Sequence, residues 1–322
     1  MSPGREAIWA VVTPVYEDGQ SFASLCRDLA RLDTGTRLEI LAVDDGSTVA
    51  PPETSAIRDS GLTGRIIRLK RNSGHQVAIW VGLAVAASES RYAGVIVMDS
   101  DGEDEPEYVP RLVAALTAGS HAAVARRGRR TESLLFRLFY HIYRRFFRLL
   151  TGRDMRFGNF CALDRCAVLR LIAMQETRIH LAAAIIKSRL SRVELSCDRG
   201  RRYDGQSRMN FYDLALHGIR AVAVFDDAVL TRMGAVCAGA AVSGILVFLT
   251  ALALKLSGQT APGWLTFLTG FLVLVFLQTA VLSLVALIMN ALGYRSPADL
   301  EAAAASLILK TETTGPDDPA DA

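Results

Sequence analysis

The chain has 322 residues, of which 51% are hydrophobic and 21% are charged, with a formal net charge of +3. Its mean hydropathy of +0.25 is too high for an ordinary soluble enzyme, and two uncharged stretches, 233–254 and 264–292, carry the excess. Each is long enough for a helix across a bilayer, which needs about 20 apolar residues. A purely soluble enzyme, a disordered chain and a secreted disulfide scaffold are therefore excluded.

The first 125 residues alternate between strand and helix patterns. Four short apolar runs predict strands, and the segments between them favour helices. The predicted strands are 7–12, 38–43, 65–69 and 92–98, and the clearest helices are 22–32 and 76–87. Strands separated by helix-length segments indicate βαβ units and a mostly parallel α/β sheet.

Ligands of such sheets bind beyond the carboxyl ends of the strands. An acidic segment follows the strand 92–98, with carboxylates at Asp99 and Asp101 and a further one at Glu103. Mg²⁺ in proteins takes one or two carboxylates plus substrate phosphates, and it neutralises charge on a leaving diphosphate. This segment therefore predicts a divalent-cation site, although an ordinary solvated loop remains the alternative.

Two further segments follow predicted strands, and both suit a nucleoside. In the segment 44–48, a carboxylate can accept hydrogen bonds from a base or a ribose hydroxyl. In the segment 13–18, Pro14 supplies a rigid turn and Tyr16 an aromatic wall. The alternatives are an ordinary strand-to-turn corner and a packed tyrosine.

The stretch 126–156 is strongly basic, because ten arginines face only Glu132 and Asp154, which leaves a local charge of +8. Aromatic residues interleave with the arginines, and apolar residues share one helical face. This pattern is typical of a helix lying in a membrane interface, and it predicts interfacial helices at about 131–150 and 210–225. The alternative is a solvated surface helix with a core-facing stripe.

A second basic segment, 199–208, predicts a mobile loop. Arg202 and Arg208 suit the role of clamps that close over phosphate groups. The alternative is a solvated cationic surface.

The two apolar stretches predict a transmembrane hairpin at 226–300, with spans at about 233–254 and 266–292. A catalytic domain is predicted before it, at 1–225, and a partly disordered tail after it, at 301–322. Arginines flank the hairpin on the side of the domain and tail, which places both in the cytoplasm of a multi-pass inner-membrane protein. Five scattered cysteines without paired spacing agree with a reducing compartment.

The order of these motifs is more specific than any one of them. VTPVYED, VDDGST, MDSDGEDEP and RRYDGQSR, followed by two spans, resemble glycosyltransferase family 2, and most of all its polyprenyl-phosphate glycosyltransferases. The segments ARRGRRTESLLFRLFYHIYRRF and GNFCALDR are similar to the interfacial region of those enzymes and to the strand and turn that follow it. The resemblance covers about residues 8–295.

The resemblance implies a GT-A fold, a nucleotide-sugar donor (a UDP-sugar first of all), a polyprenyl-phosphate acceptor such as undecaprenyl phosphate, and Mg²⁺ or Mn²⁺ as cofactor. It also implies inversion at the anomeric carbon and a homo-oligomer, a tetramer in relatives, with the lipid bilayer as a partner and no nucleic acid.

Site residues follow by matching this chain to the family motifs. The residues matched to the nucleoside site are Pro14, Tyr16, Asp18, Asp45 and Ser47. Those matched to the diphosphate and its cation are Asp99, Asp101 and Glu103, and those matched to phosphate contacts are Arg126, Arg202 and Arg208, with Arg127 or Arg129 as alternatives to Arg126.

The match departs from the family at three places. Glu17-Asp18 stands where the family usually has Asn-Glu, Glu103 where it often has Gln, and Arg208 where it usually has Lys. At position 208 the positive charge is kept, but a guanidinium and an ammonium differ in geometry.

A lipid monophosphate has a second pKa of about 6, so it is its own nucleophile at neutral pH. No general base is required, and the five scattered histidines are predicted to be structural: His75, His121, His141, His180 and His217. Three alternatives stay open: a transferase with a soluble acceptor, a processive polysaccharide synthase, and a non-catalytic scaffold. The chain lacks the Gln-x-x-Arg-Trp motif of processive synthases.

Overall fold

The computed structural model describes residues 7–116, 119–127, 144–204, 211–258, 263–293 and 297–314. The chain divides into two compact units. One comprises residues 1–144, 153–224 and 295–322, and the other comprises 145–152 and 225–294. The first unit contains the sheet and the second contains the two long apolar helices.

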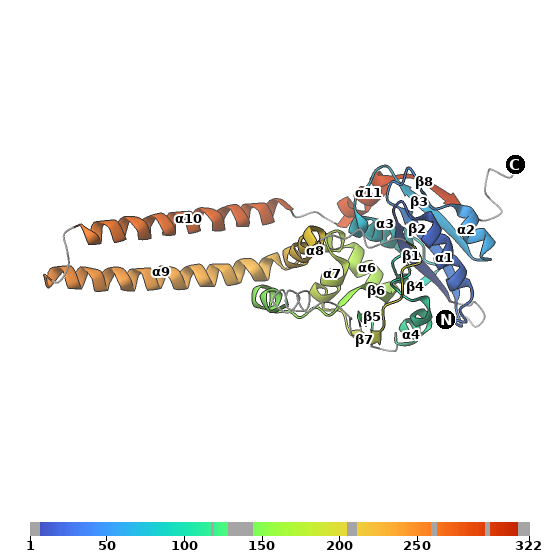
Figure 1. Ribbon diagram of the computed structural model, residues 1–322, viewed down its shortest axis with the longest axis horizontal. Helices are drawn as coiled ribbons and strands as arrows, with labels where there is room; N and C mark the ends of the chain where they lie inside the picture. Colours follow the sequence, from blue (N-terminus) through green and yellow to red (C-terminus); the bar gives the residue numbers. More distant parts are fainter. Residues whose placement is uncertain are drawn as a thin grey trace. The chain divides into compact units, whose positions relative to one another are not determined.

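The first unit is built on an eight-stranded sheet in the order β7-β5-β6-β4-β1-β2-β3-β8 (Figure 1). Its strands are β1 (Ile8–Val15), β2 (Arg37–Asp44), β3 (Thr63–Leu69), β4 (Tyr92–Val97), β5 (Ala122–Arg127), β6 (Phe157–Asp164), β7 (Arg192–Cys197) and β8 (Ile308–Thr313). The neighbours of β1 are parallel to it, as β3 is to β2 and β7 to β5, whereas β6 and β8 are antiparallel to theirs. The expected α/β architecture with a mostly parallel sheet is confirmed.

Helices cover both faces of this sheet, which is why its central strands are apolar throughout. On one face, α1 (Gly19–Ala30), α2 (Thr54–Asp59) and α4 (Val109–Ala114) share a core with β1 and β2. On the other, α3 (His75–Ser88) packs against β2 and β3. A Cβ at Gly82 would lie 2.5 Å from a methyl of Val12, so only glycine lets α3 approach β1 this closely.

Shorter helices complete the first unit. They are η1 (Pro106–Tyr108), α6 (Arg165–Ile172), η2 (Gln175–Arg178), α7 (Leu181–Lys187) and α8 (Phe211–Ala223). Asp164 ends β6 and caps α6, accepting a hydrogen bond from the Ala167 amide at 2.7 Å.

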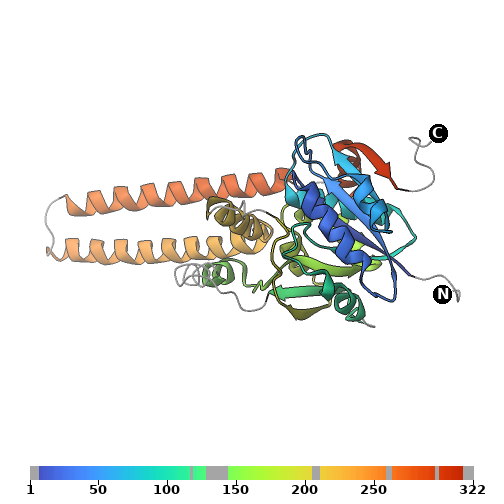
Figure 2. The same ribbon diagram turned by 45° about the vertical axis from the view of Figure 1, so that its right-hand side comes forward.

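The C-terminal segment differs from the expected tail. Residues Pro297–Leu307 form α11, and β8 then pairs with β3 at the edge of the sheet (Figures 1 and 2). Ala304 of α11 is buried in the core shared with α3. The strand is short and mostly polar, so its sequence carries no periodicity that reveals the pairing. Residues 315–322 lie outside the described part of the chain.

The second unit contains α9 (Asp226–Leu256) and α10 (Trp264–Gly293), which run side by side in opposite directions (Figures 1 and 2). Their most apolar windows have a mean hydropathy of 2.2 and are almost entirely exposed. By length and composition both helices can cross a membrane. The chain therefore has the features of a membrane-associated protein.

The described part of the first predicted interfacial helix, residues 144–150, is helical, and residues 131–143 lie outside the described part. Phe147 is buried and packs edge-on against Phe225, with ring centroids 5.8 Å apart. Phe146 and Leu149 are exposed, at 54% and 71%. Arg232 of α9 donates to the Leu149 carbonyl at 2.6 Å, which holds this helical turn against the long helix.

Candidate active site at the carboxyl edge of the sheet

The three segments picked out by sequence meet at one edge of the sheet. Parallel β1, β2 and β4 end there, and antiparallel β6 begins there. The Asp45 amide donates to the Val15 carbonyl at 2.9 Å, and the Ser100 hydroxyl donates to the Pro14 carbonyl at 3.3 Å. These bonds join the loops after β1, β2 and β4 into a single surface.

Ser47 and Glu17 brace the loop that follows β2. The Ser47 hydroxyl accepts a hydrogen bond from the Glu17 amide at 2.8 Å. The Glu17 carboxylate accepts from the amides of Thr48, Val49 and Ala50 at 2.7, 2.9 and 2.6 Å. The bonds from Ala50 and Thr48 are the main reason that the pKa of Glu17 is lowered to about 2.

The bracing role of Glu17 is not visible in the sequence. There, Glu17 only marks a departure from the family pattern. Its backbone has a φ of +49°, a left-handed conformation that L residues seldom adopt. That conformation and the loop it faces, about thirty residues later in the chain, exist only in the folded protein.

The aspartates at the last position of β2 and directly after it, Asp44 and Asp45, both hold backbone groups. Buried Asp45 accepts from the amides of Ser73 and Gly74 at 2.7 and 2.9 Å, and burial raises its pKa. Asp44 accepts from the Ser47 amide at 2.9 Å. Asp45 therefore fixes the loop that enters α3, whereas its predicted contact with a nucleoside stays a prediction.

Tyr16 and Asp18 lie beside this braced loop. Tyr16 is 45% exposed, so its ring is accessible at the edge. Asp18 precedes the first turn of α1, and its charge acts on Asp101 across the site. An exposed aromatic ring next to a fixed loop is an arrangement on which a nucleobase can stack.

The acidic loop after β4 is bound to the basic loop after β7. Arg202 contacts Asp101 at 2.9 Å through Nη2 and Glu103 at 2.9 Å through Nε. Glu103 is also paired with Arg199. The backbones are joined as well, because the Tyr203 amide donates to the Asp101 carbonyl at 2.9 Å and the Gly200 amide to the Glu103 carbonyl at 3.0 Å.

Burial raises the pKa of Asp101, and the neighbouring Asp99 raises it further against the opposing effect of Arg202. The predicted phosphate clamp and the predicted cation ligands are thus brought into direct contact. Of the two predicted clamp residues, Arg202 is placed at the site, and Arg208 lies outside the described residues.

Asp99 has a different neighbour, a histidine whose place in the sequence predicts only a structural role. His75, the first residue of α3, places Nε2 3.3 Å from Asp99 Oδ1 and 3.1 Å from Asn159 Nδ2. Gln76 then links Asn159, at 3.2 Å, to the Leu181 amide, at 2.7 Å. His75 is therefore a member of the site, because it touches a predicted cation ligand.

The fit of a divalent cation can be tested on these carboxylates. Among the residues that the structure describes, no three His, Cys, Asp or Glu side chains converge as a metal-binding group. Asp99 and Asp101 nevertheless supply the hard oxygen ligands that Mg²⁺ and Mn²⁺ prefer, and two carboxylates suffice when substrate phosphates complete the shell. The donor set therefore fits a cation that arrives with a diphosphate, in competition with Arg202.

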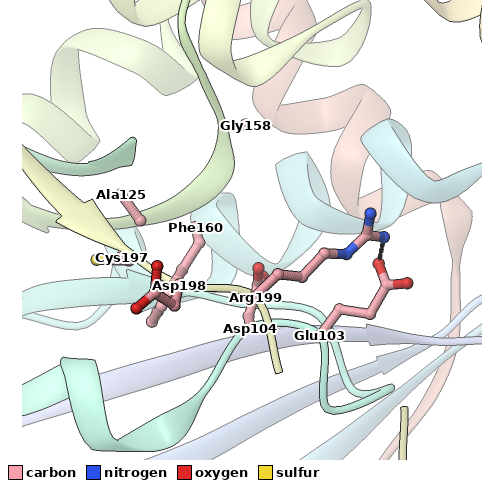
Figure 3. Close-up of a pocket in the computed structure, with 8 residues that line it drawn as sticks. All are labelled: Glu103, Asp104, Ala125, Gly158, Phe160, Cys197, Asp198 and Arg199. Atoms are coloured by element: carbon pink, nitrogen blue, oxygen red, sulfur yellow. Dashed lines mark ion pairs between the residues drawn. The ribbon is translucent and has the colours of Figure 1, made fainter. Parts of the chain in front are cut away.

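A small depression that is open to solvent adjoins the acidic loop (Figure 3). It is lined by Glu103 and Asp104, by Gly158 and Phe160 of β6, and by Asp198 and Arg199 after β7. Figure 3 shows Arg199 reaching across to Glu103. Arg126 is exposed near the carboxyl end of β5, paired in register with Phe157, so it lies at the same edge.

Comparison with known proteins agrees with this architecture. The profile described as "Glycosyl transferase family 2" matches residues 10–177, about half of the chain. The chain therefore belongs to glycosyl transferase family 2, as its motifs predict, and is an enzyme of that family.

Curated relatives match part of the chain. It is 35% identical over 138 residues to the undecaprenyl-phosphate 4-deoxy-4-formamido-L-arabinose transferase of Pseudomonas aeruginosa, covering 41% of this chain and 39% of that protein. It is 30% identical over 181 residues to the enzyme of the same name from Salmonella paratyphi B, covering 55% and 53%. The matched region spans about half or less of each relative.

Among solved structures, the chain is similar to glucosyl-3-phosphoglycerate synthase from Mycobacterium tuberculosis. The complex of that protein with Mn²⁺, UDP and glucosyl-3-phosphoglycerate matches with a TM-score of 0.49 and 18% identity, covering 70% of this chain and 80% of that one. Its complex with Mg²⁺ and UDP matches at 0.49 and 15%, covering 70% and 79%.

Proposed function

We propose that this protein transfers one sugar from a nucleotide-sugar donor, a UDP-sugar, to undecaprenyl phosphate or a similar polyprenyl phosphate, with inversion at the anomeric carbon. The observation that carries the proposal is the direct contact of Arg202 with Asp101 and Glu103. Groups suited to a diphosphate and to its cation meet there, beside the braced loop at 45–52. Two apolar helices in the same chain and the names of the relatives support a lipid acceptor.

The donor has a place along the edge of the sheet. Its base stacks on exposed Tyr16, and its ribose faces the loop held by Ser47 and Glu17. Its diphosphate lies against the acidic loop, where Arg202 exchanges a carboxylate partner for a phosphate partner. A guanidinium suits both, because it binds either group through a planar fork of N–H donors.

A divalent cation would be held by Asp99 and Asp101, with Glu103 beside them, and would neutralise charge on the departing diphosphate. The acceptor phosphate, with a second pKa of about 6, is largely ionised at neutral pH and needs no general base. Its oxygen forms the new bond to the anomeric carbon as the bond to the diphosphate oxygen breaks. Arg202 and Arg126 then stabilise the nucleoside diphosphate as it leaves.

The membrane supplies the acceptor. We propose that α9 and α10 span the inner membrane, that the helical turns around 144–151 lie in its interface through Phe146 and Leu149, and that the catalytic unit is cytoplasmic. The arginines flanking the hairpin support this orientation through the positive-inside tendency. A homo-oligomer, as the family resemblance implies, belongs to the same proposal.

The test is a transfer assay with the full chain in nanodiscs, undecaprenyl phosphate, Mn²⁺ or Mg²⁺, and a panel of radiolabelled UDP-sugars. We expect label from one donor to enter the organic phase only when the lipid phosphate is present. If water-soluble acceptors replace the lipid phosphate, label that becomes joined to one of them would instead establish a soluble acceptor. Release of free sugar alone from every donor would overturn the proposal.

A further inference from the structure

The C-terminal strand places an acidic side chain against the nucleoside side of the site. Strand β8 pairs antiparallel with β3 (Figure 1). In this pairing Lys310 lies opposite Arg68 and Glu312 lies opposite Ile66. The Glu312 carboxylate accepts from the Arg68 guanidinium at both oxygens, at 3.0 and 2.9 Å. The bonds from Arg68 are the main cause that lowers the pKa of Glu312 to about 2.

Arg68 also holds two further groups. Its Nη1 donates to Asp44 Oδ2 at 2.7 Å, and its Nη2 donates to the Pro52 carbonyl at 3.1 Å. The Arg68 side chain is only 17% exposed and that of Asp44 only 2%. A guanidinium in so little water keeps its orientation only while its donors are satisfied.

These bonds reach both ends of the loop between β2 and α2. Asp44 stands at its start, where its other carboxylate oxygen accepts from the Ser47 amide at 2.9 Å. Pro52 stands near its end. Glu17 holds the middle through the amides of residues 48–50. Glu312 thus supports, through one arginine, the two ends of the loop at 45–52.

We propose that Glu312 is a positioning residue for nucleotide binding, which acts through Arg68 on the loop at 45–52. The C-terminal strand then contributes to donor binding, because it supplies Glu312. The identity of the ligand, a uridine diphosphate, rests on the function proposed above, whereas the coupling between Glu312 and the loop does not. The strand follows the two long helices in the chain. Through its pairing with β3, the segment C-terminal to these helices therefore contributes to donor affinity.

Without the Glu312 carboxylate, only Asp44 and the Pro52 carbonyl hold the Arg68 guanidinium, so its orientation is less well fixed. The bonds from Arg68 that fix the two ends of the loop are then weaker. The chemistry takes place at the acidic loop, whereas the side-chain bonds of Arg68 described above go to Glu312, Asp44 and Pro52. The expected effect therefore falls on donor binding and leaves turnover nearly unchanged.

Two measurements on the full chain in detergent test the coupling. The first is amide hydrogen exchange of residues 47–50 without any ligand, which we expect to be faster by about tenfold in Glu312→Gln, as for a loss near 1.4 kcal/mol. Lys310→Gln is the matched control, because Lys310 is an exposed cation of the same strand that contacts Glu312 and leaves the Arg68 fork in place. Unchanged exchange in Glu312→Gln would overturn the proposal.

The second measurement is titration with UDP and Mn²⁺. We expect Glu312→Gln to bind UDP about tenfold more weakly, with a raised KM for the donor and a kcat within about twofold, whereas Lys310→Gln binds as the parent does. Binding of UDP as tight as in the parent would overturn the nucleotide role. If exchange changes as expected but the parent does not bind UDP, the coupling holds and the proposed function fails.

Discussion

Arg202 and Asp101 form an ion pair with 2.9 Å between Nη2 and Oδ2, and their side chains are 26% and 16% exposed. The pair connects the basic segment after β7 to the acidic segment after β4, two regions for which the sequence predicts different roles, phosphate binding and cation binding. When a diphosphate and its cation bind, Arg202 must leave Asp101 to contact phosphate, and Asp101 must leave Arg202 to contact the cation. The ion pair and the contacts with the ligands are therefore alternative arrangements of one site.

Asp101→Asn is expected to reduce transfer at least about a hundredfold, because the charge that would hold the cation is lost. Its fold should be retained, since the raised pKa of Asp101 means that the fold disfavours its ionised form. Transfer and the thermal midpoint would be measured together, with Glu107→Gln, an exposed carboxylate of the same segment, as the control. Parent-level turnover in Asp101→Asn would remove the cation role.

Arg202→Ala is expected to tighten the binding of Mn²⁺ in the absence of nucleotide, because the guanidinium no longer competes for Asp101 and Glu103. The same variant should bind UDP more weakly when Mn²⁺ is saturating, since a phosphate partner is lost. Electron paramagnetic resonance of free Mn²⁺ measures the first effect and calorimetry the second. Arg201→Ala, at the exposed neighbouring position, should change neither. Weaker Mn²⁺ binding in Arg202→Ala would contradict the competition.

The carboxylate of Glu17 makes stability depend on pH. Its folded pKa of about 2 lies below the ordinary value of 4.5, chiefly because of the bonds from Ala50 and Thr48. A lowered pKa stabilises the fold above the ordinary value, and this contribution is lost as the pH falls from about 4.5 toward 2. Glu17→Gln should therefore lower the thermal midpoint at pH 7. The gap to the parent should narrow steadily below pH 4.5, and a constant gap would refute this.

Gln76 is expected to be a stabilising residue of the site. It is buried and joins the Leu181 amide to Asn159, which in turn contacts His75. Gln76→Met keeps the volume but leaves a buried amide without its acceptor, at a cost of about 1–3 kcal/mol. Thermal unfolding would measure this, with Gln20→Met at an exposed position of α1 as the control. Equal thermal midpoints for the two variants would contradict a stabilising role of the hydrogen bonds of Gln76.

His75 is expected to affect transfer more than stability, because its imidazole lies at the first turn of α3 and touches Asp99. His75→Ala should lower transfer by about tenfold or more, as for loss of one close polar contact with a charged group. His121→Ala is a useful comparison, since His121 also contacts a carboxylate, Asp164, at 2.7 Å, away from the acidic loop. Equal losses of transfer in the two variants would argue against a special place for His75.

Features that depend on local pattern can be predicted from the amino-acid sequence. Apolar runs predict the strands, helix-length segments between them predict parallel pairing, and uncharged stretches predict α9 and α10. Since parallel strands end at one edge of a sheet, the positions of the segments 13–18, 44–48 and 99–103 directly after strands are enough to assign them to a common site. The order of their motifs is enough to recognise the family, and the fold places these segments together.

The partner of each charge, in contrast, is set by tertiary packing. Arg68 and Glu312 are 244 positions apart, Glu17 bonds amides about thirty positions away in a left-handed conformation, and His75 meets Asp99 only where α3 begins beside β4. The periodicity of a sequence does not reveal which group a polar side chain will contact, and many different partners can neutralise the same charge. Only the packing of α11 on α3, and of β8 on β3, selects the pairing that makes the C-terminal segment part of the site.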